Sequence, residues 1–212
     1  NVTGGTVSAP SGDLYVRGAW NLYGAGAFTH NGGNVILTGT ASDEFRHNNS
    51  AVKFNNVEIR TQFMEWGALA STTTDTVWVE GDLNLTSSGD LGNVSLVFEG
   101  DLTTGAGSSL ILDENAIAAG SANQIINLNS TTQLQTEGLM INKSAGNVSL
   151  ASTMTLDLLT LKKGNLTPGA NTFTVAGPNN IIGGNATSFI DGRLFITASS
   201  PWSGSRYLRP IG

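Results

Sequence analysis

The stretch LMINKSAGNVSLASTMTLDLLTLKKGNL, residues 139–166, alternates apolar and polar residues in short runs. Val148 and Leu150, for example, flank a serine. Alternation of this kind places successive side chains on opposite faces of a β-strand, one buried and one exposed to water. The phase reverses between Leu158 and Leu159, so the chain must bend there to keep one face buried. Short strands separated by bends predict a chain that winds as a β-solenoid.

Related segments recur along the chain, which indicates a repeat protein. GNVSL occurs twice with an offset of 146 − 92 = 54 residues, and EGDL occurs twice with an offset of 99 − 80 = 19. An offset near 19 fits one solenoid turn, and the longer offsets fit about three or four turns. The matched segments are GNVSL (92–96 and 146–150), GNVIL (33–37), LYVRGAWNL with VWVEGDLNL (14–22 and 77–85) and EGDL (80–83 and 99–102). We therefore predict an all-β fold, a right-handed parallel β-helix with turns of about 20 residues.

The composition fits strands and tight turns better than helices. Only 12% of the 212 residues are charged, against about 25% in an average soluble protein, so Ser, Thr, Asn and Gly must supply much of the surface. There is no cysteine, which excludes disulfides, cysteine zinc sites and thiol catalysis. A net charge of −6 argues against a nucleic-acid partner, because phosphate binding needs a basic field. No apolar run is as long as a membrane helix, so we expect no membrane insertion.

The chain divides into a solenoid over residues 1–192 and C-terminal capping or connecting strands over residues 193–212. Residues 60–76, RTQFMEWGALASTTTDT, lack alternation and are predicted to form a loop or a short helix that leans on the solenoid. The first residue is Asn1 rather than Met. We therefore expect that a signal or an earlier sequence has been removed and that the chain is a segment of a longer protein.

Several segments resemble a repeat of very large surface proteins of Gram-negative bacteria that export through the type IX route. The matching residues are Phe54-Asn55-Asn56, Ile141-Asn142-Lys143, Gly164-Asn165-Leu166, SFIDG (188–192) and RPIG (209–212). The resemblance covers roughly residues 14–212 and consists mostly of turn and core residues. It implies a β-solenoid in an adhesive or structural extracellular protein. The chain departs from the family pattern at residues 60–76, and at Arg193 and Arg209, where the family often has Pro and Phe.

Two pairs of residues are candidates for chemistry, and both have a simpler interpretation. His30 and His47 lie 47 − 30 = 17 residues apart, close to one turn, so they could stack as metal ligands, although no ligand spacing is diagnostic. Asp82 and Asp101 occupy the same place in the two EGDL segments, and carboxylates on neighbouring turns can form an acid–base pair. A Gly-Asp corner with an Asx turn would also explain them. We predict no catalytic residue, no metal and no cofactor.

Three aromatic residues are the better candidates for binding. By phase, Tyr15 and Trp78 should point outward at equivalent positions of two turns, and Trp66 lies in the segment without alternation. Exposed aromatic rings are uncommon without a partner, and flat rings stack on sugars or on partner surfaces. Alternatively, the segment that contains Trp66 covers the other two rings and buries them.

The ends of a solenoid offer unpaired backbone groups, so they need a cap or a neighbouring repeat. Residues 1–13 contain no bulky apolar side chain that could close a core. The C-terminal stretch contains Trp202, Arg206, Tyr207 and Arg209, which are the candidate residues for self-association with the next unit. Alternatively, this tail folds back as its own cap.

Two functions follow from these observations. The sequence favours a non-catalytic structural or adhesive segment of a cell-surface or extracellular filament, whose partners are neighbouring repeats or copies of itself placed end to end. The alternative is a carbohydrate-binding or carbohydrate-cleaving β-helix with a polysaccharide as its partner. A groove lined by Asp, Arg and aromatic residues on three successive turns would favour the alternative. A face of Ser, Thr and Asn alone would favour the structural segment.

Overall fold

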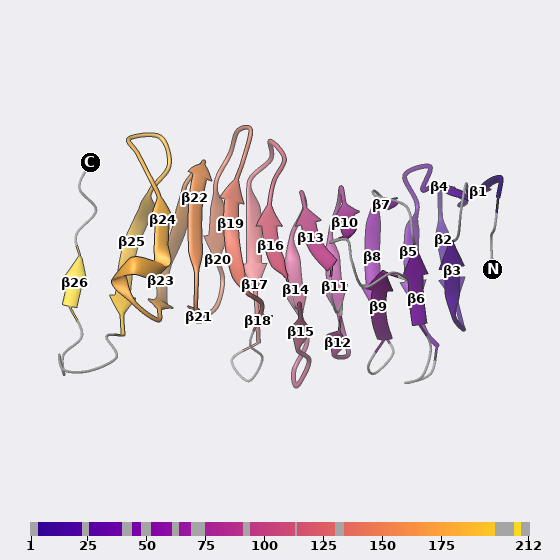
Figure 1. Cartoon of the computed structure of the whole chain (residues 1–212), viewed down its shortest axis with the longest axis horizontal. Coiled ribbons are helices and arrows are strands. Elements are labelled where there is room, and N and C mark those ends of the chain that lie inside the picture. Colours follow the sequence, from indigo (N-terminus) through magenta and orange to yellow (C-terminus); the bar gives the residue numbers. More distant parts are fainter. Residues whose placement is uncertain are drawn as a thin grey trace.

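The computed structural model is a parallel β-solenoid of about seven turns, each of about 21 residues (Figure 1). The structure describes residues 4–22, 26–39, 44–47, 52–60, 64–68, 75–90, 94–112, 114–129, 134–197 and 206–208. The turns lie side by side along the long axis of the molecule (Figure 1). The predicted all-β fold and the predicted turn length are therefore confirmed.

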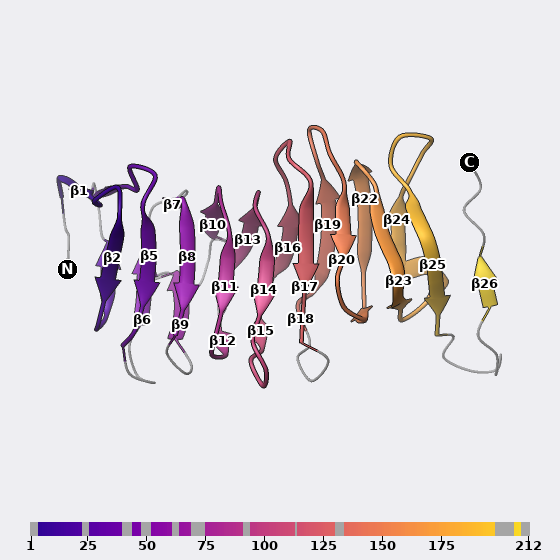
Figure 2. The ribbon, with the colours of Figure 1, turned by 180° about the vertical axis from the view of Figure 1, so that it is seen from behind.

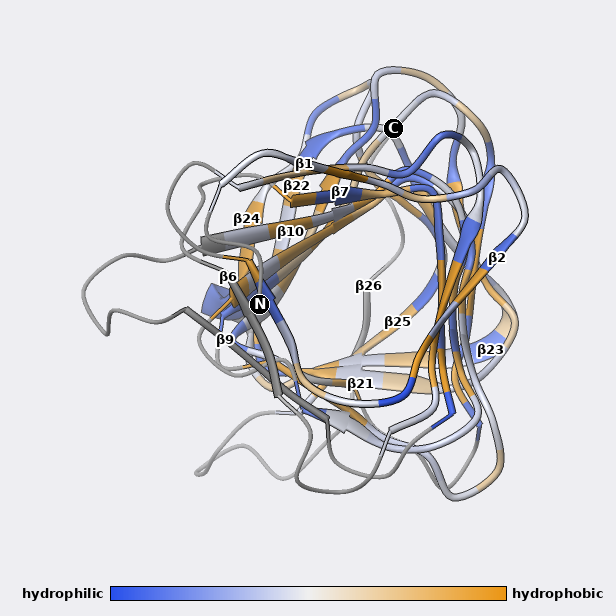
Figure 3. Ribbon diagram, turned by 90° about the vertical axis from the view of Figure 1, so that its right-hand side faces the viewer, coloured by the Kyte–Doolittle hydropathy of each residue, from blue (hydrophilic) through white to orange (hydrophobic). Residues whose placement is uncertain are grey.

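The middle turns of the solenoid, residues 52–135, pass in a fixed order through three sheets, which enclose the core (Figure 3). The seven-stranded sheet consists of β7 (Val52–Phe54), β10 (Asp75–Val79), β13 (Val94–Phe98), β16 (Asn115–Ala118), β19 (Gly138–Asn142), β22 (Leu159–Lys163) and β24 (Ile181–Gly183). The six-stranded sheet consists of β3 (Trp20–Leu22), β6 (Glu44–His47), β9 (Met64–Ala68), β12 (Gly89–Asp90), β15 (Leu110–Ile111) and β18 (Leu134–Gln135).

The eleven-stranded sheet runs the length of the molecule (Figure 2). It consists of β2 (Asp13–Val16), β5 (Asn34–Leu37), β8 (Asn56–Ile59), β11 (Leu83–Leu85), β14 (Leu102–Thr104), β17 (Gln124–Asn127), β20 (Val148–Leu150), β21 (Met154–Leu156), β23 (Leu166–Val175), β25 (Ile190–Ile196) and β26 (Arg206–Leu208). All its pairs are parallel except β25 with β26, which is antiparallel. A short sheet of β1 (Thr6–Ser8) and β4 (Ala27–Thr29) and a 3-10 turn, η1 (Pro178–Asn180), complete the described elements.

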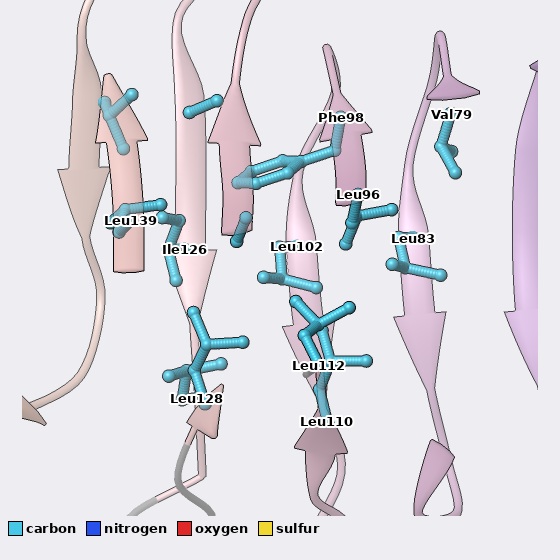
Figure 4. Close-up of a cluster of buried hydrophobic side chains, with 14 of the residues drawn as sticks. Val79, Leu83, Leu96, Phe98, Leu102, Leu110, Leu112, Ile126, Leu128 and Leu139 are labelled. Carbon is cyan, nitrogen blue, oxygen red and sulfur yellow. The ribbon is translucent and has the colours of Figure 1, made fainter. Parts of the chain in front are cut away.

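Apolar side chains stack in register inside the solenoid and form one continuous core (Figure 4). On the eleven-stranded sheet, Leu83 pairs with Leu102 on the next turn, and Leu102 pairs with Ile126. All three are fully buried, and burial of such a side chain stabilises the fold by about 1.5–3 kcal/mol. The alternation of apolar and polar residues predicts which positions face inward, and nine of the apolar residues in phase with it are buried: Leu22, Val79, Leu85, Val94, Leu96, Val148, Leu150, Leu156 and Leu161. Val16 packs against this core but is only partly buried.

Glycine shapes the corners in two different ways. Gly146 and Gly164 have φ angles of 70° and 85°, the left-handed region that side chains disfavour, so these corners need glycine for its backbone conformation. Gly81 and Gly100, the glycines of the two EGDL segments, instead stack on each other. A Cβ atom on Gly100 would overlap the backbone carbonyl of Gly81, so this corner needs glycine for close approach between turns.

The predicted equivalences between repeats are only partly right. The EGDL match is confirmed, because Leu83 and Leu102 pair directly with an offset of 19. The match of residues 14–22 with 77–85 is wrong, because β2 lies in the eleven-stranded sheet and β10 in the seven-stranded sheet. The two GNVSL copies likewise lie in different sheets, in β13 and β20. All three sheets need the same apolar–polar alternation, so a strand of one sheet resembles a strand of another.

The described part of residues 60–76 does not form the predicted loop or helix. It contains β9 and the start of β10, and β9 pairs in parallel with β6 and β12. Strand pairing is made by backbone groups, so β9 can form without apolar alternation. Residues 61–63 and 69–74 lie outside the described part of the chain. The predicted domain boundary at residue 193 lies inside β25.

Candidate functional site

A ladder of aspartate and asparagine side chains, the Asx ladder, runs along the edge where each turn enters the eleven-stranded sheet. The amide of Asn34 donates to Asp13 Oδ1 at 2.8 Å, and the amide of Asn56 donates to Asn34 Oδ1 at 2.9 Å. Asn56 Oδ1 accepts the backbone N–H of Asp82 at 2.7 Å, and Asp82 Oδ1 accepts that of Asp101 at 2.8 Å. The ladder therefore ties five successive turns together and satisfies polar groups at the corner.

The hydrogen bonds of the Asx ladder define the role of Asp82 and Asp101. They lie on neighbouring turns, as the EGDL repeat predicts, but their hydrogen bond joins the carboxylate of one to the backbone of the other. Asp101 Oδ1 in turn accepts the backbone N–H of Ile125 at 2.7 Å. The hydrogen bonds run between turns rather than within a local Asx turn. Both carboxylates thus hold the corner, and this arrangement gives no support to an acid–base pair.

A hollow of about 280 Å³, the outer hollow, lies beside the ladder on the outer face of β2, β5, β8 and β11. Ile36 gives it an apolar lining and is only 3% exposed, although its strand position points outward. The polar lining comes from Asp13, Asn34, Asn56, Glu58, Arg60, Asp82 and Asn84. Three carboxylates and one guanidinium give this lining a formal charge of −3 + 1 = −2.

Glu58 and Arg60 form a two-pronged ion pair at the hollow. Arg60 Nε donates to Glu58 Oε1 at 2.6 Å, and a second guanidinium nitrogen donates to Oε2 at 2.8 Å. The two residues are separated by one position in the chain, so both side chains project from the same face of the strand. This hydrogen bonding raises the pKa of Arg60 further above its usual value, with smaller contributions from Tyr15 and Asp13. The planar pair is thereby held in one orientation.

Tyr15 lies beside the outer hollow on β2. It pairs in register with Ile36, which pairs in turn with Glu58 on the next turn. Its side chain is 49% exposed, and its hydroxyl donates to Asp13 Oδ2 at 3.3 Å. Tyr15 therefore points outward as predicted. Asp13 lies on its own strand, and the Glu58–Arg60 pair lies two turns further along.

Sequence reasoning missed Glu58, Arg60, Asn34 and Asn84 as parts of this site. The signal was present: Glu58 and Arg60 have the spacing that puts two side chains on one face of a strand. The stacking of β2, β5, β8 and β11 brings them next to Tyr15, and this stacking requires the correct alignment of turns. The predicted match of residues 14–22 with 77–85 placed β2 against the wrong strand.

The other two predicted aromatic positions lie elsewhere. Trp78 belongs to β10 in the seven-stranded sheet, so it is not equivalent to Tyr15. It is half-buried, donates its ring N–H to Glu99 Oε1 at 2.8 Å, and has Lys53 Nζ 4.6 Å from its ring centroid. Trp66 belongs to β9 in the six-stranded sheet, and its side chain lies outside what the structure describes. The three positions therefore lie on three different sheets.

The two histidines do not stack. His30 follows β4 and lies 3.3 Å from Glu80 through Nε2, whereas His47 ends β6 on the six-stranded sheet. Lys53 lies 3.1 Å from the other carboxylate oxygen of Glu80. Across the described ranges, no group of three or more His, Asp and Glu side chains is placed to hold a metal ion.

The structure describes only some of the residues that were predicted to mediate self-association. Arg206 and Tyr207 belong to β26, which pairs antiparallel with the second half of β25, and their side chains lie outside what the structure describes. Trp202 and Arg209 lie outside the described residues altogether. The pairing of β26 does show that this segment covers one strand edge of the eleven-stranded sheet.

Lys143 is a buried cation that sequence reasoning did not single out. Its ammonium donates to the carbonyl of Ala119 and to Gln124 Oε1, both at 2.5 Å. Gln124 in turn donates to the carbonyls of Phe98 and Gly100. Burial lowers the pKa of Lys143, and the charge of Glu99 partly offsets that shift. The network joins three turns across a corner, and its polar groups are paired as buried groups must be.

The comparisons with known proteins give no match: no family model, no curated protein and no solved structure is significantly similar to the chain. In the described part of the chain, no helix has the length and apolar character needed to cross a membrane.

Proposed function

We propose that the chain is a non-catalytic structural and adhesive segment of an extracellular or cell-surface filament. The observation that carries the proposal is the continuous stack of turns, in which core, backbone pairing and Asx ladder all join one turn to the next. Each such turn is stabilised mainly by its neighbours, so a stack of this kind extends by adding turns and forms a rigid rod.

The resemblance to repeats of type IX surface proteins supports the same role and a surface location. The residues that resemble that family, such as Gly164 and Phe54, are corner and core residues of the solenoid. They support a shared architecture rather than a shared site. We propose the right-handed winding that parallel crossovers adopt in nearly all proteins.

Association end to end is part of the proposal. Among the described strands, none pairs with the outer edge of β24, and Ile182 on that strand is 51% exposed. At the other end of the solenoid, Leu14 on β2 is only partly buried. An open strand edge and an incompletely covered core at opposite ends suit head-to-tail contact between units. Trp202, Arg206, Tyr207 and Arg209 remain the proposed contact residues at the C-terminal end.

The cleaving form of the carbohydrate alternative has less support. Asp82 and Asp101 are the best-placed carboxylates on neighbouring turns, and each uses an oxygen to hold a backbone N–H of the next turn. The binding form is compatible with the structural role, because an adhesive segment holds a surface by binding it.

Deletion of residues 201–212 tests end-to-end association. If the tail makes contacts between units, the truncated chain should stay folded by circular dichroism but lose self-association in sedimentation velocity. The double variant R206A/R209A is the matched charge control, and it should weaken association mainly at low salt, since exposed ion pairs contribute only about 0–1 kcal/mol each. A truncated chain that unfolds, while the intact chain sediments as a monomer at high concentration, would make the tail a cap and remove the fibre from the proposal.

A further inference from the structure

The exposed ring of Tyr15 lies beside the outer hollow, next to lining side chains that are already fixed. Both carboxylate oxygens of Glu58 accept from Arg60, and both oxygens of Asp13 accept, one from Asn34 and one from Tyr15. A ligand that contacts these groups finds them oriented before it arrives. The ordering cost that normally opposes binding is therefore small for these side chains.

The hollow also contains polar groups that can form further hydrogen bonds. Asn84 is exposed, and within the described residues its amide makes no hydrogen bond. Asp82 uses Oδ1 in the ladder, which leaves Oδ2 as an acceptor. Arg60 has five N–H donors, of which two are engaged with Glu58. Acceptors and donors side by side are what adjacent hydroxyl groups require, since each hydroxyl both donates and accepts.

The size of the site limits what it can hold. Four stacked strands span three intervals of about 4.8 Å, or about 14 Å along the solenoid axis. A pyranose ring in a linear glycan occupies about one such interval, so the four strands extend beneath about three rings of a glycan that lies over the hollow. Tyr15 lies at the β2 end of this span, where its half-exposed side chain can stack on a sugar face.

The charge of the site selects the kind of sugar. The lining has a formal charge of −2, with Arg60 already paired to Glu58. Uronates and other anionic sugars would be repelled, whereas a neutral sugar meets hydrogen-bonding groups without that cost. We propose that the outer hollow binds a neutral glycan, about three rings long, which lies along the solenoid axis with one ring stacked on Tyr15. This glycan site is a function in addition to the proposed structural role, and separate experiments test the two proposals.

Calorimetric titration of the full chain with neutral oligosaccharides tests the proposal. The probes are glucose, mannose, xylose and galactose oligomers of three to six units, with trigalacturonic acid as the anionic comparison. We expect at least one neutral oligomer to bind and the acid to bind at least about tenfold more weakly. Tyr15→Ala should weaken the neutral ligand about tenfold or more, whereas Tyr15→Phe, which keeps the ring, should cost about threefold at most.

Two further variants separate local contact from a change in the fold. Asn84→Ala should weaken binding about threefold to tenfold, because it removes a free donor and acceptor. Ile182→Ala is the matched control: it truncates an exposed side chain on β24, far along the solenoid, and should leave binding unchanged. Every variant should keep the circular dichroism spectrum and Tm of the parent chain.

Four results would overturn the proposal: no neutral oligomer binds, trigalacturonic acid binds as well as the neutral ligand, Tyr15→Ala binds normally while folded, or tetralysine binds and the neutral oligomers do not. The last result would assign the hollow to cationic peptides. Loss of end-to-end association alone would leave the glycan site intact.

Discussion

The eleven-stranded sheet presents two different surfaces on one scaffold. Over its first four strands the outward residues are large and varied, with Tyr15, Glu58 and Arg60 around the outer hollow. Over β20 and β23 the outward positions are Ser149 and Thr167. The inward residues have the same stacked pattern in both regions. The difference shows that the core determines the solenoid while the outward positions are free to differ from turn to turn.

This division also separates the two functions considered for the chain. A face of small hydroxyl side chains suits a structural rod, and the later turns present Ser149, Thr155 and Thr167 there, between the exposed Ile125 and the exposed Asp191 and Arg193 of β25. An arginine, aspartates and an aromatic ring suit ligand binding, and the early turns bring them to one face: Tyr15 and Asp13 on the turn of β2, Arg60 on that of β8 and Asp82 on that of β11. The turn of β5 contributes none of these residue types, so the set does not occupy three successive turns. The two proposed functions therefore depend on different lengths of one solenoid and do not exclude each other.

The largest expected effect concerns what the two regions share. Leu83→Asn in the early turns and Leu150→Asn in the later turns should each lower the free energy of unfolding by about 2–4 kcal/mol, because each places an unpaired amide in the core. Both leucines are buried, at 0% and 4% exposure. Urea denaturation measures the change. Thr155→Ala, at an exposed position of β21, is the control and should stay within about 0.5 kcal/mol. Unequal losses would mean that the core does not serve both regions alike.

A smaller effect is expected at the Asx ladder. Asp82→Ala should cost about 1–2 kcal/mol, because the backbone N–H of Asp101 loses its acceptor. Asp82→Asn keeps an oxygen at the same place and should be nearly neutral. In the later turns, Asn165→Ala should cost less than Asp82→Ala, because its hydrogen bond to the N–H of Phe189 is longer, at 3.2 Å. Thermal unfolding of the three variants gives the order, and the reverse order would contradict a ladder that is tighter in the early turns.

The smallest effect concerns pH. Burial lowers the pKa of Lys143 below its usual value of 10.5, so between the two pKa values the folded chain is neutral at this site while the unfolded chain is protonated. The unfolded state then binds more protons, and the stability contributed by this site rises with pH across that window. Relative to Lys143→Met, the parent chain should gain stability as pH is raised from neutral toward 10.5. Urea unfolding at stepped pH values measures the difference, and a difference that does not change with pH would show that Lys143 keeps its usual pKa.

The fold could be predicted from the sequence because its cause is local. Alternation at Val148 and Leu150 and the phase change at Leu158-Leu159 fix strands and a bend, and the structure ends β21 at Leu156 and begins β22 at Leu159. The alignment of turns could not be predicted so well. The offsets between residues paired in parallel on the eleven-stranded sheet vary from 166 − 148 = 18 to 83 − 57 = 26. A fixed repeat length therefore pairs the wrong strands.

Because the alignment of turns could not be predicted, most of the candidate site could not be predicted either. Tyr15 could be singled out because an outward aromatic ring is visible in the alternation of one strand. Its neighbours Glu58 and Arg60 lie more than forty residues away and become neighbours only through the stacking of β2, β5 and β8. Lys143 could not be identified from the sequence for another reason. A lysine in a polar run is normally exposed, and the burial of this one depends on hydrogen bonds to groups of a neighbouring turn, such as the carbonyl of Ala119.

The direction of the backbone hydrogen bonds has a mechanical consequence. The strands stack along the long axis, so the bonds between turns lie along that axis as well (Figure 2). Tension applied between the two ends of the rod peels the outermost turn and opens its bonds one after another instead of shearing them together. Each detached turn of about 21 residues releases up to about 70 Å of extended chain. A rod built this way lengthens in steps under load, and it dissipates mechanical work at its ends before a contact attached to it is broken.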